Sequence, residues 1–270
     1  MNALVCHIEK QDDTNFMSSA HGFFSLGGAI GAVLGSFLMG FFLNPVYHMI
    51  LTASCVILIN MRLSKHYFHI TESVTSKEKK KFQLKSLSPL LIIAFLAFVI
   101  MSSEGAIEHW STLYLIEVVE ITERNLAGLG FILFSTAMTI GRFFGDGISA
   151  KRGSIKVILL GCLVASMGYL CVLLNMLVVT VIGFGLVGLG LSVIVPELFR
   201  IAGNTKDVSA SAGISFVSGI GFVGFLLGPV VLGFISDSYS LKTSFLTLLV
   251  LTVFAFIVSF SKFKLETTTS

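Results

Sequence analysis

Charged side chains are scarce in this chain of 270 residues, making up 12% of the sequence against 54% hydrophobic residues. An ordinary soluble domain carries about 25% charged residues. The uncharged stretches are also long, because no Asp, Glu, Lys or Arg occurs in residues 14–61 or in residues 157–196. This scarcity excludes a water-soluble globular fold and predicts an integral membrane protein with the lipid bilayer as its surroundings.

Cysteine is also rare, and the four cysteines show no CxxC spacing of the kind that binds metals. Two GxGxxG matches, at 183–188 and 219–224, lie inside uncharged runs, whereas a dinucleotide site needs this pattern between a strand and a helix. No Ser-His-Asp, zinc-binding or paired-carboxylate pattern can be assembled from the other polar residues. We therefore expect no enzyme activity, no cofactor and no metal site.

Long apolar runs predict an all-α, polytopic membrane helix bundle of about eight transmembrane helices, because a hydrocarbon core about 30 Å thick needs roughly 20 apolar residues per helix. The two double-length runs carry turn residues near their middles, Asn44-Pro45 in one and Asn175 in the other. The expected spans are 17–42, 46–64, 89–116, 125–147, 155–174, 177–199, 208–234 and 243–261.

The basic residues favour one orientation of these spans. With the amino terminus on the cytoplasmic side, all of the 18 Lys and Arg residues except Arg124 and Lys242 fall in cytoplasmic segments, as the positive-inside rule requires. We therefore expect a multi-pass protein of the cell membrane with both termini cytoplasmic. The net charge of +3 then reflects topology, and no nucleic-acid partner is expected.

Several motifs resemble one transporter family. Residues 141–146 read GRFFGD and residues 151–153 read KRG, which resembles the cytoplasmic-loop signature of the major facilitator superfamily in its copy between helices eight and nine. The segments HGFFSLGG at 21–28 and EGAIEHW at 104–110, with Gly228, Pro229 and Gly233, resemble the fifth, seventh and eleventh helices of the branch that includes the fucose permeases and many bacterial inner-membrane porters.

The resemblance implies that the eight spans correspond to helices five to twelve of that fold, with the first four helices absent. Residues 1–64 would hold the last two helices of the N-terminal half and residues 65–88 a basic cytosolic linker. Residues 89–264 would form the C-terminal six-helix half, and residues 265–270 a cytosolic tail.

The resemblance also implies a function, secondary active transport by alternating access in a bacterial inner membrane. The expected partners are the bilayer and a small polar solute, sugar-like and coupled to protons. The alternative is a non-transporting membrane scaffold or a truncated remnant of a transporter.

Ionisable residues inside the spans, with the neighbouring Trp110, are the candidates for a substrate or proton pathway, because ionisable groups are costly in a membrane. Glu104 and Glu108 are four residues apart and share a helix face. Interfacial anchoring is the alternative for Glu108 and its neighbours, and an ion pair with Arg200 is the alternative for Glu197. The candidates are Glu104, Glu108, His109, Trp110, His21 and Glu197.

The loop signature supplies a candidate gating loop, formed by Gly141, Arg142, Gly145, Asp146, Arg152 and Gly153. Asp146 lies near the end of a helix, where the helix dipole disfavours a negative charge. We expect Arg142 and Arg152 to supply positive charge, and the start of the helix near Ser18 and Ser19 to lie within about 10 Å of Asp146.

Glycines recur at helical spacing in two of the spans, where they allow close helix packing or bending during a transport cycle. The expected packing positions are Gly27, Gly31 and Gly35 in the first span, and Gly224, Gly228, Pro229 and Gly233 in the seventh.

Overall fold

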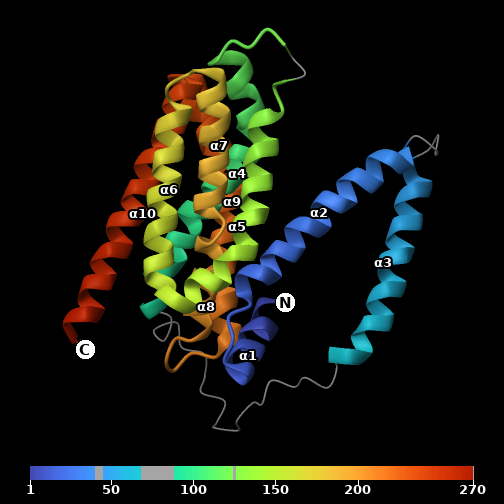
Figure 1. Cartoon of the computed structure of the whole chain (residues 1–270), viewed down its shortest axis with the longest axis vertical. Coiled ribbons are helices and arrows are strands. Elements are labelled where there is room, and N and C mark those ends of the chain that lie inside the picture. Colours follow the sequence, from blue (N-terminus) through green and yellow to red (C-terminus); the bar gives the residue numbers. More distant parts are fainter. Residues whose placement is uncertain (40–44, 68–87, 124–125, 270) are drawn as a thin grey trace. The chain divides into compact units, whose positions relative to one another are not determined.

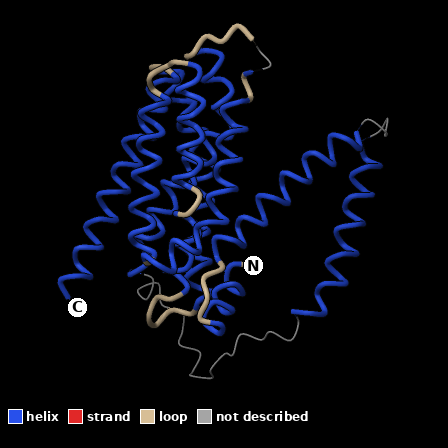
Figure 2. Tube along the Cα trace, viewed as in Figure 1, coloured by secondary structure: helices blue, strands red, loops and turns tan. Residues whose placement is uncertain are grey.

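The computed structural model describes residues 1–39, 45–67, 88–123 and 126–269. Figure 2 shows helices joined by loops throughout these residues. The helices are α1 (Asn2–Asp12), α2 (Met17–Met39), α3 (Pro45–Tyr67), α4 (Leu91–Glu117), α5 (Leu129–Arg152), α6 (Ser154–Val172), α7 (Leu177–Leu191), α8 (Ile194–Gly203), α9 (Ala210–Ser238) and α10 (Leu241–Thr269).

The prediction of an all-α polytopic membrane bundle is confirmed. Each expected span coincides with a helix, and α7 with α8 makes up the span expected at 177–199. Six of the described segments are long and apolar enough to cross a bilayer: Val46–Lys65, Ser88–Glu117, Ser154–Val172, Leu177–Gly203, Ala210–Ser238 and Leu241–Ser261. Of the other two, α5 carries the charged residues of the loop signature, and α2 includes side chains outside the described set.

Three local features were not predicted. Helix α1 covers eleven polar and apolar residues to which the sequence analysis assigned no helix. The predicted span at 177–199 is interrupted at Ser192 and Val193, because Pro196 lacks the N–H that the Ser192 carbonyl would accept in a continuous helix. At the other end of the chain, α10 continues to Thr269, so the predicted tail is helical as far as it is described.

The chain divides into two compact units. The first unit contains residues 1–22 and 83–270, and therefore α1, the start of α2 and the bundle α4–α10. The second unit contains residues 23–82, with the rest of α2 and α3. The predicted linker at 65–88 lies almost entirely outside the described residues, so the proposed boundary between two transporter halves stays a prediction.

Within the first unit, α8, α1 and the two chain termini lie toward the same end of the bundle (Figure 1). The turn between α6 and α7 lies at the opposite end. Asn175 occupies this turn with a φ of 58°, a left-handed conformation that asparagine tolerates better than most residues. The hairpin turn predicted from Asn175 is therefore present.

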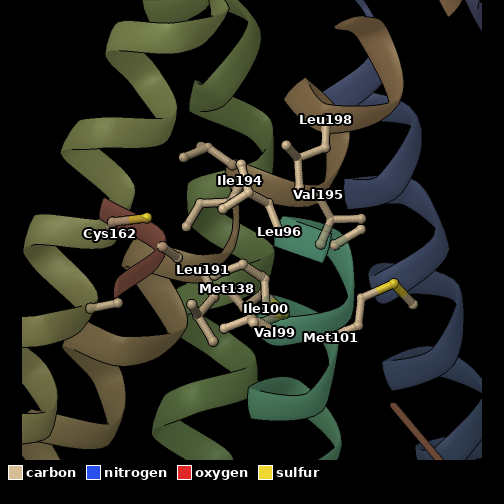
Figure 3. Close-up of a cluster of buried hydrophobic side chains, with 14 of the residues drawn as sticks. Leu96, Val99, Ile100, Met101, Met138, Cys162, Leu191, Ile194, Val195 and Leu198 are labelled. Carbon is tan, nitrogen blue, oxygen red and sulfur yellow. The ribbon is translucent and has the colours of Figure 1, made fainter. Parts of the chain in front are cut away.

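The interior of the first unit is apolar, and several helices contribute side chains to it (Figure 3). Leu96 and Ile100 of α4, Met138 of α5, Leu191 of α7 and Ile194 of α8 are all buried. The outer surface is apolar as well, with side chains such as Leu226 and Phe234 about 70% exposed. Such a surface is stable only against lipid, because contiguous exposed apolar area of this extent is rare on soluble monomers.

Glycines of α9 allow it to pack directly on α4. A Cβ at Gly228 would lie 2.7 Å from the carbonyl oxygen of Ser102, and one at Gly224 would overlap the carbonyl of Phe98. A Cβ at Gly233 would lie 3.1 Å from the Trp110 ring. The glycines of α9 therefore set the distance between two backbones.

The glycine stripe of α2 differs from that of α9. Among the described residues, and apart from the adjoining part of α2 itself, no atom lies within 4 Å of a Cβ built on Gly27, Gly31 or Gly35. A packing role for these three glycines stays a prediction.

The close approach of α9 to α4 predicts the effect of Gly228→Ala. The added methyl would collide with the backbone of Ser102, so we expect a loss of about 1–3 kcal/mol of stability. The measurement is the thermal midpoint of the purified protein in detergent. Gly219→Ala is the matched control on the same helix, because a Cβ there meets nothing within 4 Å. Equal midpoints for the two variants would contradict this account of the interface.

Candidate functional site: a buried charge network and an interior ion pair

A network of charged side chains surrounds Arg200 on α8, which is only 7% exposed. Its Nε donates to both carboxylate oxygens of Glu9 on α1, at 3.2 and 3.1 Å. Its Nη2 donates to Glu9 Oε1 at 2.8 Å and to Asp146 Oδ1 on α5 at 2.9 Å. One guanidinium thus joins three helices that are far apart in the sequence.

The third nitrogen of Arg200 completes the network. Nη1 donates to the hydroxyl of Ser149 on α5 at 2.9 Å and to Oε1 of Glu197, one helical turn earlier on α8. Glu197 has no exposed surface. Three carboxylates therefore share one cation in a buried setting, where charge-assisted hydrogen bonds are roughly twice as strong as neutral ones.

The start of α2 supplies further donors to two of these carboxylates. The backbone N–H groups of Ser18 and Ser19 donate to Asp146 at 3.0 and 2.7 Å. Those of Phe16 and Met17 donate to Glu9 at 2.6 and 2.7 Å. The first N–H groups of a helix have no intrahelical partner and carry partial positive charge, so these carboxylates cap the helix.

Two glycines of the loop signature let α5 reach this position. A Cβ at Gly145 would lie 2.7 Å from Ser18 Oγ and 3.0 Å from Val193, and one at Gly141 would lie 2.9 Å from Ser192 Cβ. A third glycine, Gly153, has a φ of 78° between α5 and α6, a conformation that other residues rarely adopt. The signature therefore allows α5 to approach the start of α2 and the break before α8.

The expected position of Asp146 at the helix start near Ser18 and Ser19 is confirmed. The expected partner Arg152 is wrong among the described contacts, because Arg152 is exposed and the salt bridge to Asp146 comes from Arg200. Arg142, the other expected cation, forms a salt bridge with Glu104. The assignment failed because Arg152 is an exposed residue at the end of α5, whereas Arg200 comes from another helix, α8. The gating role of this loop stays a prediction.

The ion pair expected between Glu197 and Arg200 is present. Glu9 and Ser149 were missed as members of the same network. Glu9 lies 191 residues from Arg200 in the sequence, and no motif links them. Glu9 is one of three acidic residues, with Asp12 and Asp13, in the polar stretch before the first span, and nothing in the sequence distinguishes it from the other two.

A second charged pair lies inside the bundle. Arg142 Nη2 of α5 is 3.7 Å from Glu104 Oε1 of α4, and their side chains are 9% and 14% exposed. Buried hydroxyls of Ser103 and Tyr169 lie in the same region, with Tyr169 close enough to Glu104 for an electrostatic interaction. The pair and the hydroxyls form a polar patch in an otherwise apolar interior.

The predicted residues His21, Glu108 and His109 differ from one another in their contacts and exposure. His21 interacts electrostatically with Arg142 and Asp146, and its ring centroid is 5.7 Å from that of Phe199. Glu108 and His109 are exposed on α4. His109 Nδ1 lies 2.7 Å from the Gly105 carbonyl.

Trp110 has a structural contact. Its indole N–H donates to the Pro229 carbonyl of α9 at 3.0 Å. Trp110, Pro229 and Gly233 therefore belong to one α4–α9 interface, and a pathway role for Trp110 stays a prediction.

Within the described residues, no group of three or more His, Cys, Asp and Glu side chains could hold a metal ion.

Comparison with known proteins gives consistent similarities. The profile of the Major Facilitator Superfamily matches residues 2–205 and 123–270. An uncharacterised MFS-type transporter of Yersinia pestis is 34% identical over 258 residues, covering 94% of this chain and 66% of that protein. Membrane protein MosC of Rhizobium meliloti is 34% identical over 181 residues, covering 66% of this chain and 44% of that protein. The chain thus spans less than two thirds of the length of these relatives.

Solved structures with the same fold include the fucose:proton symporter FucP of E. coli, with a TM-score of 0.76 and 19% identity over 90% of this chain and 67% of that one. FucP in its outward conformation matches with a TM-score of 0.77 and 19% identity, covering 90% of this chain and 66% of that one. At 19% sequence identity, the similarity to FucP shows that the two proteins share a fold.

The network predicts a large effect for Arg200→Met. Three buried carboxylates would lose their shared cation, and removing one partner of a buried ion pair costs about 3–5 kcal/mol. We expect a marked fall in the thermal midpoint in detergent, and partial recovery when Glu197→Gln is added. Arg152→Met, an exposed cation, is the control. A fall no larger than that of the control would refute the central role of Arg200.

Proposed function

Because the chain belongs to the major facilitator superfamily, we propose that it acts as a secondary active transporter of a small polar solute. It would work by alternating access in a bacterial inner membrane, with both termini cytoplasmic. The distribution of Lys and Arg supports this orientation. The apolar helices support a multi-pass position in the bilayer.

The observation that carries the proposal is the ion pair between Glu104 and Arg142. At 1.5 Å per residue, Glu104 lies roughly 20 Å from the start of α4 and Arg142 roughly 15 Å from the end of α5. Both distances are measured from the same end of the bundle, so the pair lies near the middle of a core about 30 Å thick. Ionisable groups at that depth are functional candidates by default.

The chemistry of this patch fits a polyhydroxylated, sugar-like solute. A carboxylate accepts hydrogen bonds from hydroxyl groups, a guanidinium donates to their oxygens, and the hydroxyls of Ser103 and Tyr169 do both. The carboxylate of Glu104 is also the group that would carry a coupled proton. The fold neighbour FucP is described as a fucose:proton symporter, which supports this class of solute and coupling.

The Arg200 network is proposed as the cytoplasmic gate. In the family arrangement, α1 and the start of α2 belong to the N-terminal half, whereas α5 and α8 belong to the C-terminal half. The bonds of Glu9 and Asp146 then hold the two halves together at the cytoplasmic end. Breaking them would open this side to the cytoplasm.

Uptake into proteoliposomes tests the transport proposal. We expect the reconstituted chain to exchange a labelled sugar or polyol by counterflow, and Glu104→Gln to abolish proton-driven accumulation. Glu117→Gln, an exposed carboxylate at the end of the same helix, is the control. A folded protein that moves no member of a broad polyol panel would favour the alternative, a non-transporting membrane scaffold.

Labelling of a native cysteine tests the gate. Cys6 of α1 is fully buried against Gly203 of α8. Asp146→Ala removes two charge-assisted hydrogen bonds and one ion pair, so we expect alkylation of Cys6 to accelerate at least about tenfold. Peptide-resolved mass spectrometry after a timed maleimide pulse measures the rate. Lys151→Ala, an exposed residue at the end of α5, should leave the rate unchanged. A slow rate in both variants would argue against a gate at this position.

A further inference from the structure

We infer that the end of the bundle that carries the Arg200 network also holds a binding site for the phosphate headgroup of an anionic phospholipid. The site is a cavity of about 570 Å³ between the start of α4, the turn from α5 to α6 and the end of α8. Arg200 belongs both to the wall of this cavity and to the charge network.

The charge of the cavity selects an anion. Arg152, Lys156 and Arg200 line it, and none of the described residues along its wall is acidic. The guanidinium of Arg200 already donates from all three nitrogens to Glu9, Asp146, Ser149 and Glu197. The charge of a bound phosphate would therefore be met by Arg152 and Lys156, both of which are exposed.

The backbone reinforces this preference. Ser154, Ile155 and Lys156 form the first turn of α6 and line the cavity. No side chain caps this helix start, and its first turn contains no acidic residue. A basic pocket between membrane helices on the cytoplasmic side is the setting in which anionic lipid headgroups bind.

The apolar walls favour a lipid over a free phosphate ion. Pro89, Ile93 and Ile201 face the cavity together with the cations. A second cavity of about 560 Å³ shares Arg152 with the first and lies along α5 and α6, where Phe144, Ile148 and Leu160 line it together with the cation Lys151. An acyl chain fits this apolar groove while its headgroup occupies the basic cavity, whereas inorganic phosphate would leave the groove empty.

The test is thermal stabilisation of the purified full chain in detergent by added phosphatidylglycerol. We expect a rise in the midpoint of about 5 °C at saturating lipid, as for a ligand that binds only the folded state. Phosphatidylcholine should give a much smaller rise. The double variant Arg152→Gln, Lys156→Gln should lose most of the phosphatidylglycerol effect. The control Arg62→Gln, Lys65→Gln, which removes two exposed cations from α3, should keep it.

Three results would overturn the proposal. These are equal stabilisation by the two lipids, an unchanged phosphatidylglycerol effect in the double variant, and stabilisation by 10 mM inorganic phosphate that matches the lipid and so assigns the site to a free ion. Should the double variant fold poorly, native mass spectrometry of the wild type decides instead. Preferential retention of phosphatidylglycerol over phosphatidylcholine supports the site, and equal retention refutes it.

Discussion

At one end of the first unit, the hydrogen bonds of the Arg200 guanidinium connect helices α1, α5 and α8. Arg200 faces Glu9, Asp146 and Glu197, and neither lipid nor bulk water is available to solvate these carboxylates. In such surroundings an unpaired charge is far more costly than on a soluble surface. The positions of α1, the start of α2, α5 and α8 therefore depend on one another, because each contributes a group that the others need.

The two polar regions of the bundle differ in how completely they are satisfied. Asp146 and Glu9 receive backbone N–H groups as well as Arg200. The interior pair of Glu104 and Arg142 is longer, at 3.7 Å, and lies in the same region as the buried hydroxyls of Ser103 and Tyr169. A network with many hydrogen bonds suits a clamp, and a looser pair suits a site that exchanges partners with a solute.

The sequence was sufficient for elements whose cause is local. The uncharged runs correctly predicted the positions of the spans, and Asn175 correctly predicted a turn. The loop signature placed Asp146 beside the start of α2 through family pseudo-symmetry. The cation that pairs with Asp146 could not be predicted. The choice between Arg152 on α5 and Arg200 on α8 depends on which of the two side chains is buried beside Asp146 in the folded bundle. Glu9 was missed for the same reason, since its partner is distant in the sequence and no periodic pattern marks it.

The interruption at Ser192 and Val193 has a mechanical consequence. It separates the ten-residue helix α8, which carries Glu197 and Arg200, from α7. Glycines seat α7 closely on α6, with a Cβ at Gly168 placed 2.6 Å from the Val187 nitrogen. Because α8 is short and separated from α7 by this break, it can change its orientation while α7 stays packed on α6. A rearrangement of the charges around Arg200 then need not move the other end of the bundle.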